Sequence, residues 1–180
     1  MTDSDAATDA EADPDALTEI VRARGHENVT AEHASTFEFT TDDWLTPAGD
    51  CILAVDADRT PRDFDPAFRT ACQDPAATIV ATITVAPAGS VTGDDAASDD
   101  AASDDAASDE TRSTTIVGRG DPDLTLLDDR SMVGRTSDYT DDERTILVDA
   151  DAAAADLDHD LVDVLSEDDA SVKLRLDVKR

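Results

Sequence analysis

The sequence predicts a β-rich α+β fold in which two tandem β-β-β-α-β repeats pack about a pseudo-twofold axis. The first observation behind this prediction is an internal repeat: residues 23–45 match residues 118–140 at a constant offset of 95, and the match resumes at an offset of 93. The second is that short segments alternate polar and apolar residues, the period-two pattern of half-buried strands. Each unit has about 65 residues, too few to bury much surface alone, so we expect one shared core. The pattern leaves open whether the strands close into a barrel.

The strands are predicted from this alternation and from runs of apolar residues. In the first unit they fall at residues 19–23 and 29–31, two strand fragments that flank the break at Gly25-His26, and then at residues 36–40, 51–55 and 78–85. The run at 51–55 is the most continuously apolar, which favours a central strand. In the second unit the last strand places four apolar residues on one face: Val172, Leu174, Leu176 and Val178.

One helix is predicted in each unit, after the third strand. Asp65 followed by Pro66 is typical of an N-cap residue with proline at the first helical position. Asp158 is the corresponding cap in the second unit. Around each cap, apolar residues recur at the spacing of one helix face: Phe64, Phe68, Ala71 and Cys72 in the first unit, and Leu157, Leu161, Val164 and Leu165 in the second.

Shifts in composition divide the chain into a tail, two repeats and a linker. Residues 1–17 are acidic with little hydrophobicity, the signature of a disordered tail. Three consecutive copies of Asp-Asp-Ala-Ala-Ser fill residues 94–108, inside a low-complexity acidic linker predicted for residues 89–113. The repeats then occupy residues 18–88 and 114–180, and we expect them to form a single domain over residues 18–180.

The charge of the chain is strongly negative, with 44 acidic and 14 basic residues among 180 and a formal net charge of −30. Such a chain repels itself in the compact state, and molar salt removes most of that repulsion by shortening the Debye length to about 3 Å. The composition therefore predicts adaptation to a salt-rich cytoplasm of the haloarchaeal kind. The basic residues are scattered along the sequence, which argues against nucleic acid as a partner.

The sequence predicts neither a membrane segment nor a disulfide scaffold. The longest apolar stretch, residues 78–86, has about half of the roughly 20 residues that a spanning helix needs. Residues 1–15 are acidic and lack the basic start of a secretory signal. Cys51 and Cys72 are too few for a disulfide framework. We therefore expect a cytoplasmic protein with reduced cysteines.

Several strings in the chain resemble a known family. They are Arg24-Gly25-His26-Glu27-Asn28-Val29, then His33, Thr36 and Glu38, then Leu45-Thr46-Pro47-Ala48-Gly49-Asp50-Cys51-Ile52, and in the second half Arg135-Thr136-Ser137-Asp138-Tyr139. Together they resemble the archaeal domain-of-unknown-function family 371, over residues 18–88 and 114–179. The resemblance implies a small cytoplasmic archaeal protein of uncharacterised activity, with the acidic linker as an addition to the family pattern.

The first repeat concentrates the reactive side chains: His26, His33, Glu38, Asp50 and Cys51. Imidazole, thiolate and carboxylate are ligands of zinc, and a metal site, if there is one, would use His26, His33 and Glu38. Against a metal site, the chain has no Cys-x-x-Cys pair. In addition, one unbroken strand would point His33 and Glu38 to opposite faces. The alternative places His33 at a strand start and Glu38 on a solvated face.

Two of these residues have a chemical and a structural interpretation. His26 follows Gly25 at a break between strands, where it would contact a ligand, act as an acid or base, or bond the backbone of a turn. Cys51 would need a basic neighbour to lower its pKa and become a nucleophile, whereas the apolar run after it favours a small core residue.

The aligned pair Trp44 and Tyr139 is predicted to anchor the core rather than to stack on bases.

Two functions are consistent with these patterns. The first is a small-ligand-binding domain, enzymatic or not, with its pocket at the interface between the repeats. Polar loop residues of the first half would line the pocket: His26, Asn28, His33, Asp50 and Cys51. The second is a non-enzymatic interaction or assembly protein that pairs with itself or another component through an exposed apolar patch. The sequence names no cofactor, reaction or catalytic residue.

Overall fold

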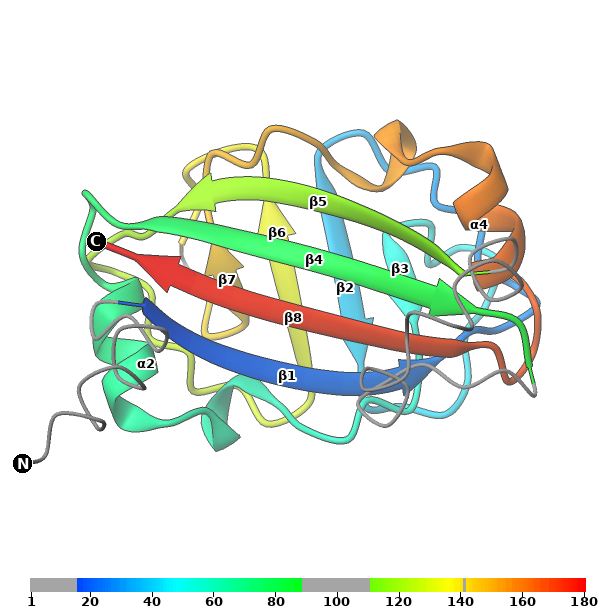
Figure 1. The fold of residues 1–180 in the computed structure, drawn as a ribbon, viewed down its shortest axis with the longest axis horizontal. Coiled ribbons are helices and arrows are strands. Elements are labelled where there is room, and N and C mark those ends of the chain that lie inside the picture. Colours follow the sequence, from blue (N-terminus) through cyan, green and yellow to red (C-terminus); the bar gives the residue numbers. More distant parts are fainter. Residues whose placement is uncertain (1–15, 89–110, 141) are drawn as a thin grey trace, which may run out of the picture.

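The computed structural model describes residues 16–88, 111–140 and 142–180. These residues form two four-stranded sheets that pack face to face (Figure 1). Sheet A is antiparallel and contains, in spatial order, β1 (Ala16–Arg24), β8 (Ser171–Lys179), β4 (Thr78–Ala86) and β5 (Arg112–Arg119). Sheet B contains β3 (Ile52–Ala54), β2 (Thr36–Thr40), β6 (Ser131–Arg135) and β7 (Thr145–Leu147). The central β2–β6 pair is antiparallel, and each edge strand of sheet B runs parallel to its neighbour.

Two short helices lie at opposite ends of the sheets, α2 (Pro66–Cys72) and α4 (His159–Leu165), as Figure 1 shows. Each follows a 3-10 turn, η1 (Pro61–Asp63) or η2 (Ala154–Asp156). The predicted N-caps are confirmed, because the Asp65 carboxylate accepts a hydrogen bond from the Ala67 amide at 2.8 Å and the Asp158 carboxylate accepts one from the Asp160 amide at 2.9 Å. The prediction of a strand-rich α+β fold is therefore correct, and the described strands do not close into one barrel.

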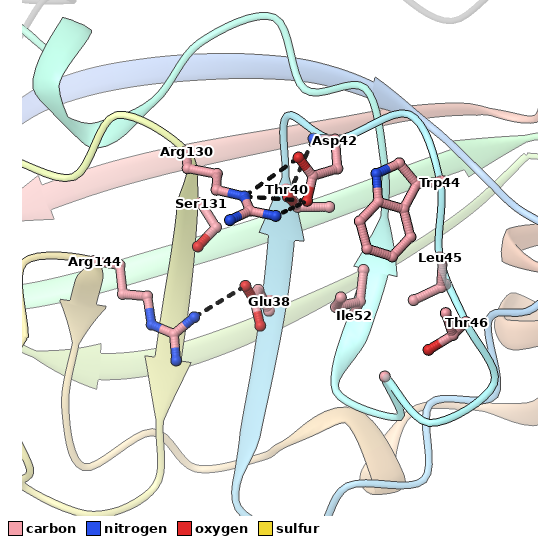
Figure 2. Close-up of a pocket in the computed structure, with 11 residues that line it drawn as sticks. Glu38, Thr40, Asp42, Trp44, Leu45, Thr46, Ile52, Arg130, Ser131 and Arg144 are labelled. Atoms are coloured by element: carbon pink, nitrogen blue, oxygen red, sulfur yellow. Dashed lines mark hydrogen bonds and ion pairs between the residues drawn. The ribbon is translucent and has the colours of Figure 1, made fainter.

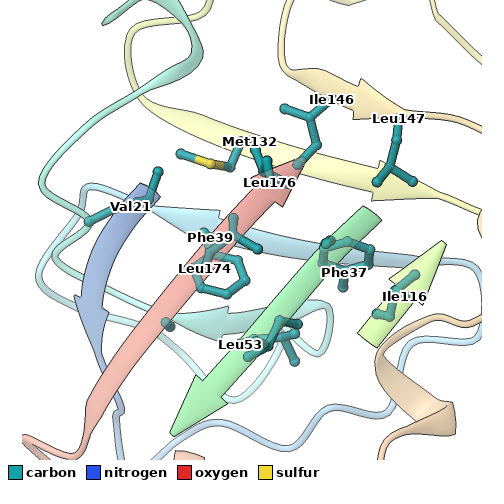
Figure 3. Packing of buried hydrophobic residues seen from close by; sticks show 14 of the residues in the cluster. Val21, Phe37, Phe39, Leu53, Ile116, Met132, Ile146, Leu147, Leu174 and Leu176 are labelled. Atoms are coloured by element: carbon teal, nitrogen blue, oxygen red, sulfur yellow. The ribbon is translucent and has the colours of Figure 1, made fainter. Parts of the chain in front are cut away.

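The core lies between the sheets, where alternate residues of each strand point inward. Phe37 and Phe39 of β2 are fully buried and point toward sheet A, which contributes Leu174 and Leu176 (Figure 3). Gly134 of β6 pairs with Phe37 across the central ladder, and a Cβ atom at this position would overlap the Phe37 ring. The Phe37 ring thus fills the space that a side chain at position 134 would occupy.

The structure corrects two of the predicted strands. Residues 29–31 form a loop, because Ala31 has a positive φ of 52° that interrupts extended backbone, and Val29 and Ala31 are buried without pairing in a sheet. The apolar run at 51–55 contains only the three-residue β3, which is an edge strand and not a central one. The last residue of the apolar run, Val55, lies just after β3 and pairs with Arg24 in an isolated antiparallel bridge at the corner between the sheets. The run is apolar because this corner is buried.

Most of the predicted tail (1–17) and linker (89–113) lies outside the described residues. Strand β1 begins at Ala16 and β5 begins at Arg112, so each strand starts two residues before the predicted repeat boundary on that side. Among the described residues, no helix has the length and apolar character needed to cross a bilayer.

Candidate functional site

The outer face of sheet B carries polar side chains that are nevertheless buried. On β2 the inward residues are Phe37 and Phe39, so Glu38 and Thr40 point to the opposite face. Ser131 of β6 pairs with Thr40 across the ladder. Glu38, Thr40 and Ser131 are only 8%, 3% and 5% exposed. Polar side chains are seldom buried on the outer face of a sheet, so this cluster marks the outer face of sheet B as a candidate binding surface.

A pocket with a volume of about 350 Å³ opens on this face (Figure 2). Its floor is formed by β2, β3 and β6, and its rim by the loop that joins β2 to β3. Both halves of the chain line it: Glu38, Thr40, Asp42, Trp44, Leu45, Thr46, Gly49 and Ile52 from the first half, and Arg130, Ser131 and Arg144 from the second. The volume suits a small molecule.

Glu38 is the buried charge of this pocket, and two side chains hold its carboxylate. Arg144 donates from Nη1 to Oε2 at 3.3 Å, and the Cys51 thiol donates to Oε1 at 3.3 Å. Burial, together with the negative charge of Glu38, raises the pKa of the Cys51 thiol to about 11. Cys51 is therefore protonated at neutral pH and acts as a hydrogen-bond donor, and Glu38 is not the basic neighbour that would lower its pKa.

Arg130 and Asp42 form an ion pair at the rim. The guanidinium donates from Nη2 to one carboxylate oxygen of Asp42 at 2.7 Å and from Nε to both oxygens at 3.2 and 3.3 Å. This hydrogen bond and the charge of Asp42 raise the pKa of Arg130 above its ordinary value. The pair thus fixes one arginine at the pocket mouth in a single orientation.

Asp142 anchors the opposite side of the pocket by holding Arg144 and Arg135. Its Oδ2 accepts from Arg135 Nη2 at 2.6 Å and from Arg144 Nε at 3.4 Å, and its Oδ1 accepts from the Thr145 hydroxyl at 2.7 Å. Burial on its own would raise the pKa of Asp142, but the hydrogen bond from Thr145 and the charge of Arg135 outweigh it and lower that pKa. Asp142 is therefore ionised and orients the arginine that reaches Glu38.

The apolar wall of the pocket consists of Trp44, Leu45 and Ile52. Trp44 is 55% exposed and Tyr139 is 47% exposed, so the prediction that this pair anchors the core is wrong. Tyr139 instead packs on Arg135, whose Cζ atom lies 4.6 Å from the ring centroid. The two aromatic residues thus differ, since Trp44 borders an open pocket and Tyr139 covers an arginine.

The sequence matches one protein family over most of its length. The family model described as "Domain of unknown function (DUF371)" matches residues 21–179. The chain belongs to the DUF371 family. It is also similar to an uncharacterized protein of Methanocaldococcus jannaschii, with 33% identity over 148 residues that cover 82% of this chain and 90% of that protein. Both matches extend over both sheets of the DUF371 fold, and neither carries an assigned activity.

His26 and Asn28, two of the predicted site residues, lie behind the pocket rim of this DUF371 domain. His26 Nδ1 accepts a hydrogen bond from the Asn28 amide at 3.0 Å, so the ring closes a local turn. The Asn28 side chain donates to the Leu45 carbonyl at 2.7 Å and thereby holds the loop that carries the apolar wall. Their geometry suits positioning of the rim.

His33, Asp50 and Cys51 also lie outside the lining of the pocket. His33 Nδ1 accepts from the Thr36 hydroxyl at 3.0 Å when that hydroxyl is the donor, and the Asp50 carbonyl accepts from the His33 amide at 3.2 Å. Only Glu38 of the predicted metal set reaches the pocket. Within residues 16–88, 111–140 and 142–180 no three His, Cys, Asp or Glu side chains are arranged to hold a metal ion.

The pocket residues that sequence reasoning missed come from the second half and from the loop after β2. Arg130, Ser131 and Arg144 carry no motif, and only their position beside β2 in sheet B brings them to Glu38. One signal was available in the sequence. The alternation in residues 36–40 places Glu38 and Thr40 together on the face opposite the two phenylalanines.

A second pocket, of about 330 Å³, lies between the 30–32 loop and helix α4 of the DUF371 domain. It is lined by Thr30, Ala31, Glu32, Ala155, Leu157, His159 and Val162. The buried Thr30 hydroxyl has no hydrogen-bond partner among the described residues. This pocket has one acid and one histidine and no arginine, so it offers fewer groups for ligand recognition than the pocket at Glu38.

Proposed function

We propose that this DUF371 protein binds a small acceptor-rich molecule, such as an aromatic carboxylate or phosphate monoester, in the pocket on sheet B. The observation that carries the proposal is the pairing of charges there. Both carboxylates that line the pocket, Glu38 and Asp42, are already engaged by arginines. The pocket groups that remain free to bind a ligand are therefore mainly hydrogen-bond donors, which suit a ligand with acceptor atoms.

The remaining donors can be named. Arg130 Nη1 and Arg144 Nη2 donate to no side chain or carbonyl in the described part of the chain. The hydroxyl groups of Thr46 and Ser131 line the same pocket. Guanidinium and hydroxyl groups are the usual partners of carboxylate and phosphate oxygens, and two held arginines need little reorganisation to bind them.

The apolar wall supports a flat group on the ligand. Trp44 presents an exposed indole at the rim, and Leu45 and Ile52 continue the apolar surface toward the floor. Burial of a ring against such a wall stabilises a complex by about 25 cal/mol for each Å² of apolar surface removed from water. A ligand that combines a ring with an anionic group would use both sides of the pocket.

Tryptophan fluorescence tests this proposal, because Trp44 is the single tryptophan of the chain. Benzoate, phenyl phosphate, a nucleoside monophosphate and inorganic phosphate are titrated separately. We expect a saturable change with at least one aromatic anion and weaker binding of inorganic phosphate. The absence of a saturable change with every aromatic anion would overturn the proposal.

Two variants locate the site within that experiment. Arg130→Gln should weaken binding of the aromatic anion about tenfold or more, since a hydrogen bond to a charged group contributes about 1.5–3 kcal/mol. Arg62→Gln removes one exposed arginine that pairs with Asp129 and does not line the pocket, so it is the matched control. Equal losses in the two variants would count against a site at Arg130.

We also propose that the two halves are copies of one unit related by a pseudo-twofold axis. The same element order, three strands, a helix and a strand, occurs in residues 16–86 and 112–179. The sheet orders β1-β8-β4-β5 and β3-β2-β6-β7 are unchanged when each strand is exchanged for its counterpart, which supports the proposal. The pocket would then lie where the copies meet, because Glu38 and Arg144 come from different halves.

The rival function is assembly through an exposed apolar surface. Trp44 and Tyr139 favour it, because both side chains are large and about half exposed. Light scattering in 2 M KCl distinguishes the two proposals. A monomer that binds an aromatic anion supports the ligand site, and a closed oligomer that dissociates on Trp44→Ala supports assembly.

A cytoplasmic location in a salt-rich cell is the remaining part of the proposal. It rests on the net charge of −30 and on the excess of acidic over basic residues. Its physical consequence, a stability that increases with salt, is open to direct measurement.

A further inference from the structure

The outer face of sheet A collects positive charge in a chain that is otherwise acidic. The residues of β8 that point away from the core are Ser171, Lys173, Arg175, Asp177 and Lys179, because Val172, Leu174, Leu176 and Val178 point inward. The ladder pairs Arg22 with Lys173 and Arg119 with Thr78, which places both arginines on the same face. This set is called the sheet A face below.

Six basic residues and one acidic residue therefore point outward from the strands of sheet A. The basic residues are Arg22, Arg24, Arg119, Lys173, Arg175 and Lys179, and the acid is Asp177. The whole chain has 14 basic and 44 acidic residues, so the ratio on this face is the reverse of the average. Both lysines of the chain lie here.

Ion pairs neutralise part of this charge. Arg24 pairs with Asp56 and Asp169, Arg119 pairs with Asp149 and Asp121, and Arg175 pairs with Asp177 at 3.0 Å. Neither Lys173 nor Lys179 has an ion-pair partner among the residues that the structure describes. The unpaired charge thus follows β8, the strand between β1 and β4.

The rest of the sheet A face is flat and rich in hydroxyl groups. Thr82 and Thr84 of β4 pair with Thr115 and Ser113 of β5, beside Arg175 and Lys173. Figure 1 looks onto this face, and the helices α2 and α4 lie at its ends and not across it. The described part of the chain therefore leaves the face uncovered.

We infer that the sheet A face binds the sugar–phosphate backbone of single-stranded nucleic acid. Arginine, lysine, serine and threonine are the side chains that contact phosphate and sugar oxygens. Lys173 and Arg175 lie about 7 Å apart along β8, and Lys179 follows about 13 Å further on, beyond Asp177, so the strand presents a row of separate cations to a polyanion. The strands of this face carry no aromatic side chain for base stacking, so the contacts are to phosphate and sugar, which carry no sequence information.

The acidic remainder of the protein opposes this binding and limits the conditions for it. Asp58 and Asp151 lie along the two edges of sheet A, where their carboxylates accept hydrogen bonds from the amides of Arg22 and Val117. At about 0.1 M salt the Debye length is about 10 Å, which screens most acids beyond the face. Nearly salt-free buffer would extend their repulsion, so the test belongs at moderate salt.

The test measures fluorescence anisotropy of a labelled 20-nucleotide oligothymidylate with the full chain between 0.1 and 0.5 M KCl. About four phosphate contacts, each contributing about −0.7, give an expected slope of log K against log [KCl] near −3. Lys173→Gln, Arg175→Gln and Lys179→Gln combined should reduce the steepness of this slope by about 2. Far-UV circular dichroism checks that the triple variant is folded.

Single variants give a matched control that does not depend on the triple variant. Arg175→Gln should reduce the steepness of the slope by about 0.7, whereas Arg62→Gln should leave it unchanged. The two arginines are 53% and 60% exposed and each pairs with one aspartate, so they differ mainly in the face they occupy. No binding at 0.1 M KCl, equal effects of the two variants, or equal competition by polyglutamate of the same charge would overturn the inference.

Discussion

Glu38 and Arg144 are 106 residues apart in the sequence, yet Arg144 Nη1 lies 3.3 Å from Glu38 Oε2. The contact joins β2 of the first half to the segment that leads into β7 of the second half. A buried carboxylate is stable only when partners satisfy it, so the second half supplies what Glu38 needs. The same pair closes one side of the pocket.

The Glu38 carboxylate should control the reactivity of Cys51. Burial and the negative charge of Glu38 together raise the pKa of this thiol to about 11. Glu38→Gln removes the charge and leaves the burial, so the pKa of Cys51 should decrease but stay above its ordinary value. The measurement is the pH dependence of iodoacetamide labelling, followed by mass spectrometry.

Cys72 serves as the internal control for that labelling. Its pKa is raised to about 12, mainly by burial, and it does not contact Glu38. Its labelling should be the same in both proteins. A labelling midpoint for Cys51 below pH 9 in the unmodified protein would contradict the geometry described for Glu38.

Alkaline pH should destabilise the fold through the same two thiols. A thiol whose folded pKa is raised contributes stability that is complete below its unfolded pKa of about 9 and is lost as pH increases through the folded value. The free energy of unfolding should therefore decrease between pH 9 and about 11 to 12. Urea unfolding at pH 8 and pH 10.5 measures it, and Cys51→Ala should show a smaller pH effect than the unmodified protein.

Gly134→Ala should destabilise the protein by about 1–3 kcal/mol, the usual cost of overpacking a core. The added Cβ atom would overlap the Phe37 ring, which is fully buried and has no free space to move into. Gly49→Ala is the control, since its Cβ atom would lie 2.8 Å from Cδ1 at the end of the Leu45 side chain, a flexible group that lines the pocket, rather than against a ring. Thermal unfolding should show a clear loss for Gly134→Ala only; a loss for Gly134→Ala no larger than that for the control would mean that the Phe37 ring adapts.

Stability should increase with KCl concentration. The formal charge of −30 makes the folded state repel itself, and added salt screens that repulsion. The melting temperature should rise by more than about 3 °C between 0.1 and 2 M KCl, which corresponds to roughly 1 kcal/mol of stabilisation for a chain of this size. A melting temperature that is constant or decreases over this range would contradict the interpretation of the composition.

The sequence predicted the local elements of the fold better than their arrangement. The N-caps Asp65 and Asp158 and the alternation in β4 and β8 are local features, and the structure has all of them. The order of strands in a sheet depends on pairing between distant segments, which local patterns do not encode. The apolar run before Val55 was therefore mistaken for a central strand when it marks a buried corner.

The candidate site was less predictable for the same reason. The reactive side chains of His26 and His33 predicted a site in the first repeat. In the structure their ring nitrogens accept hydrogen bonds from backbone amides two residues further on and stabilise local turns. Arg130 and Arg144 are ordinary charged residues until β6 and β7 bring them beside β2. The positive sheet A face was hidden likewise, because Arg22 and Lys173 meet only through the pairing of β1 with β8.

The central claim, that the sheet B pocket is a ligand site, is tested most directly by amide chemical-shift mapping with phenyl phosphate. The account predicts saturable shifts that cluster at Thr40, Trp44 and Ser131, while amides of sheet A such as Ile83 stay unchanged. Shifts that cluster instead around Thr30 and Val162 in the second pocket, or no saturable shifts at all, would contradict it.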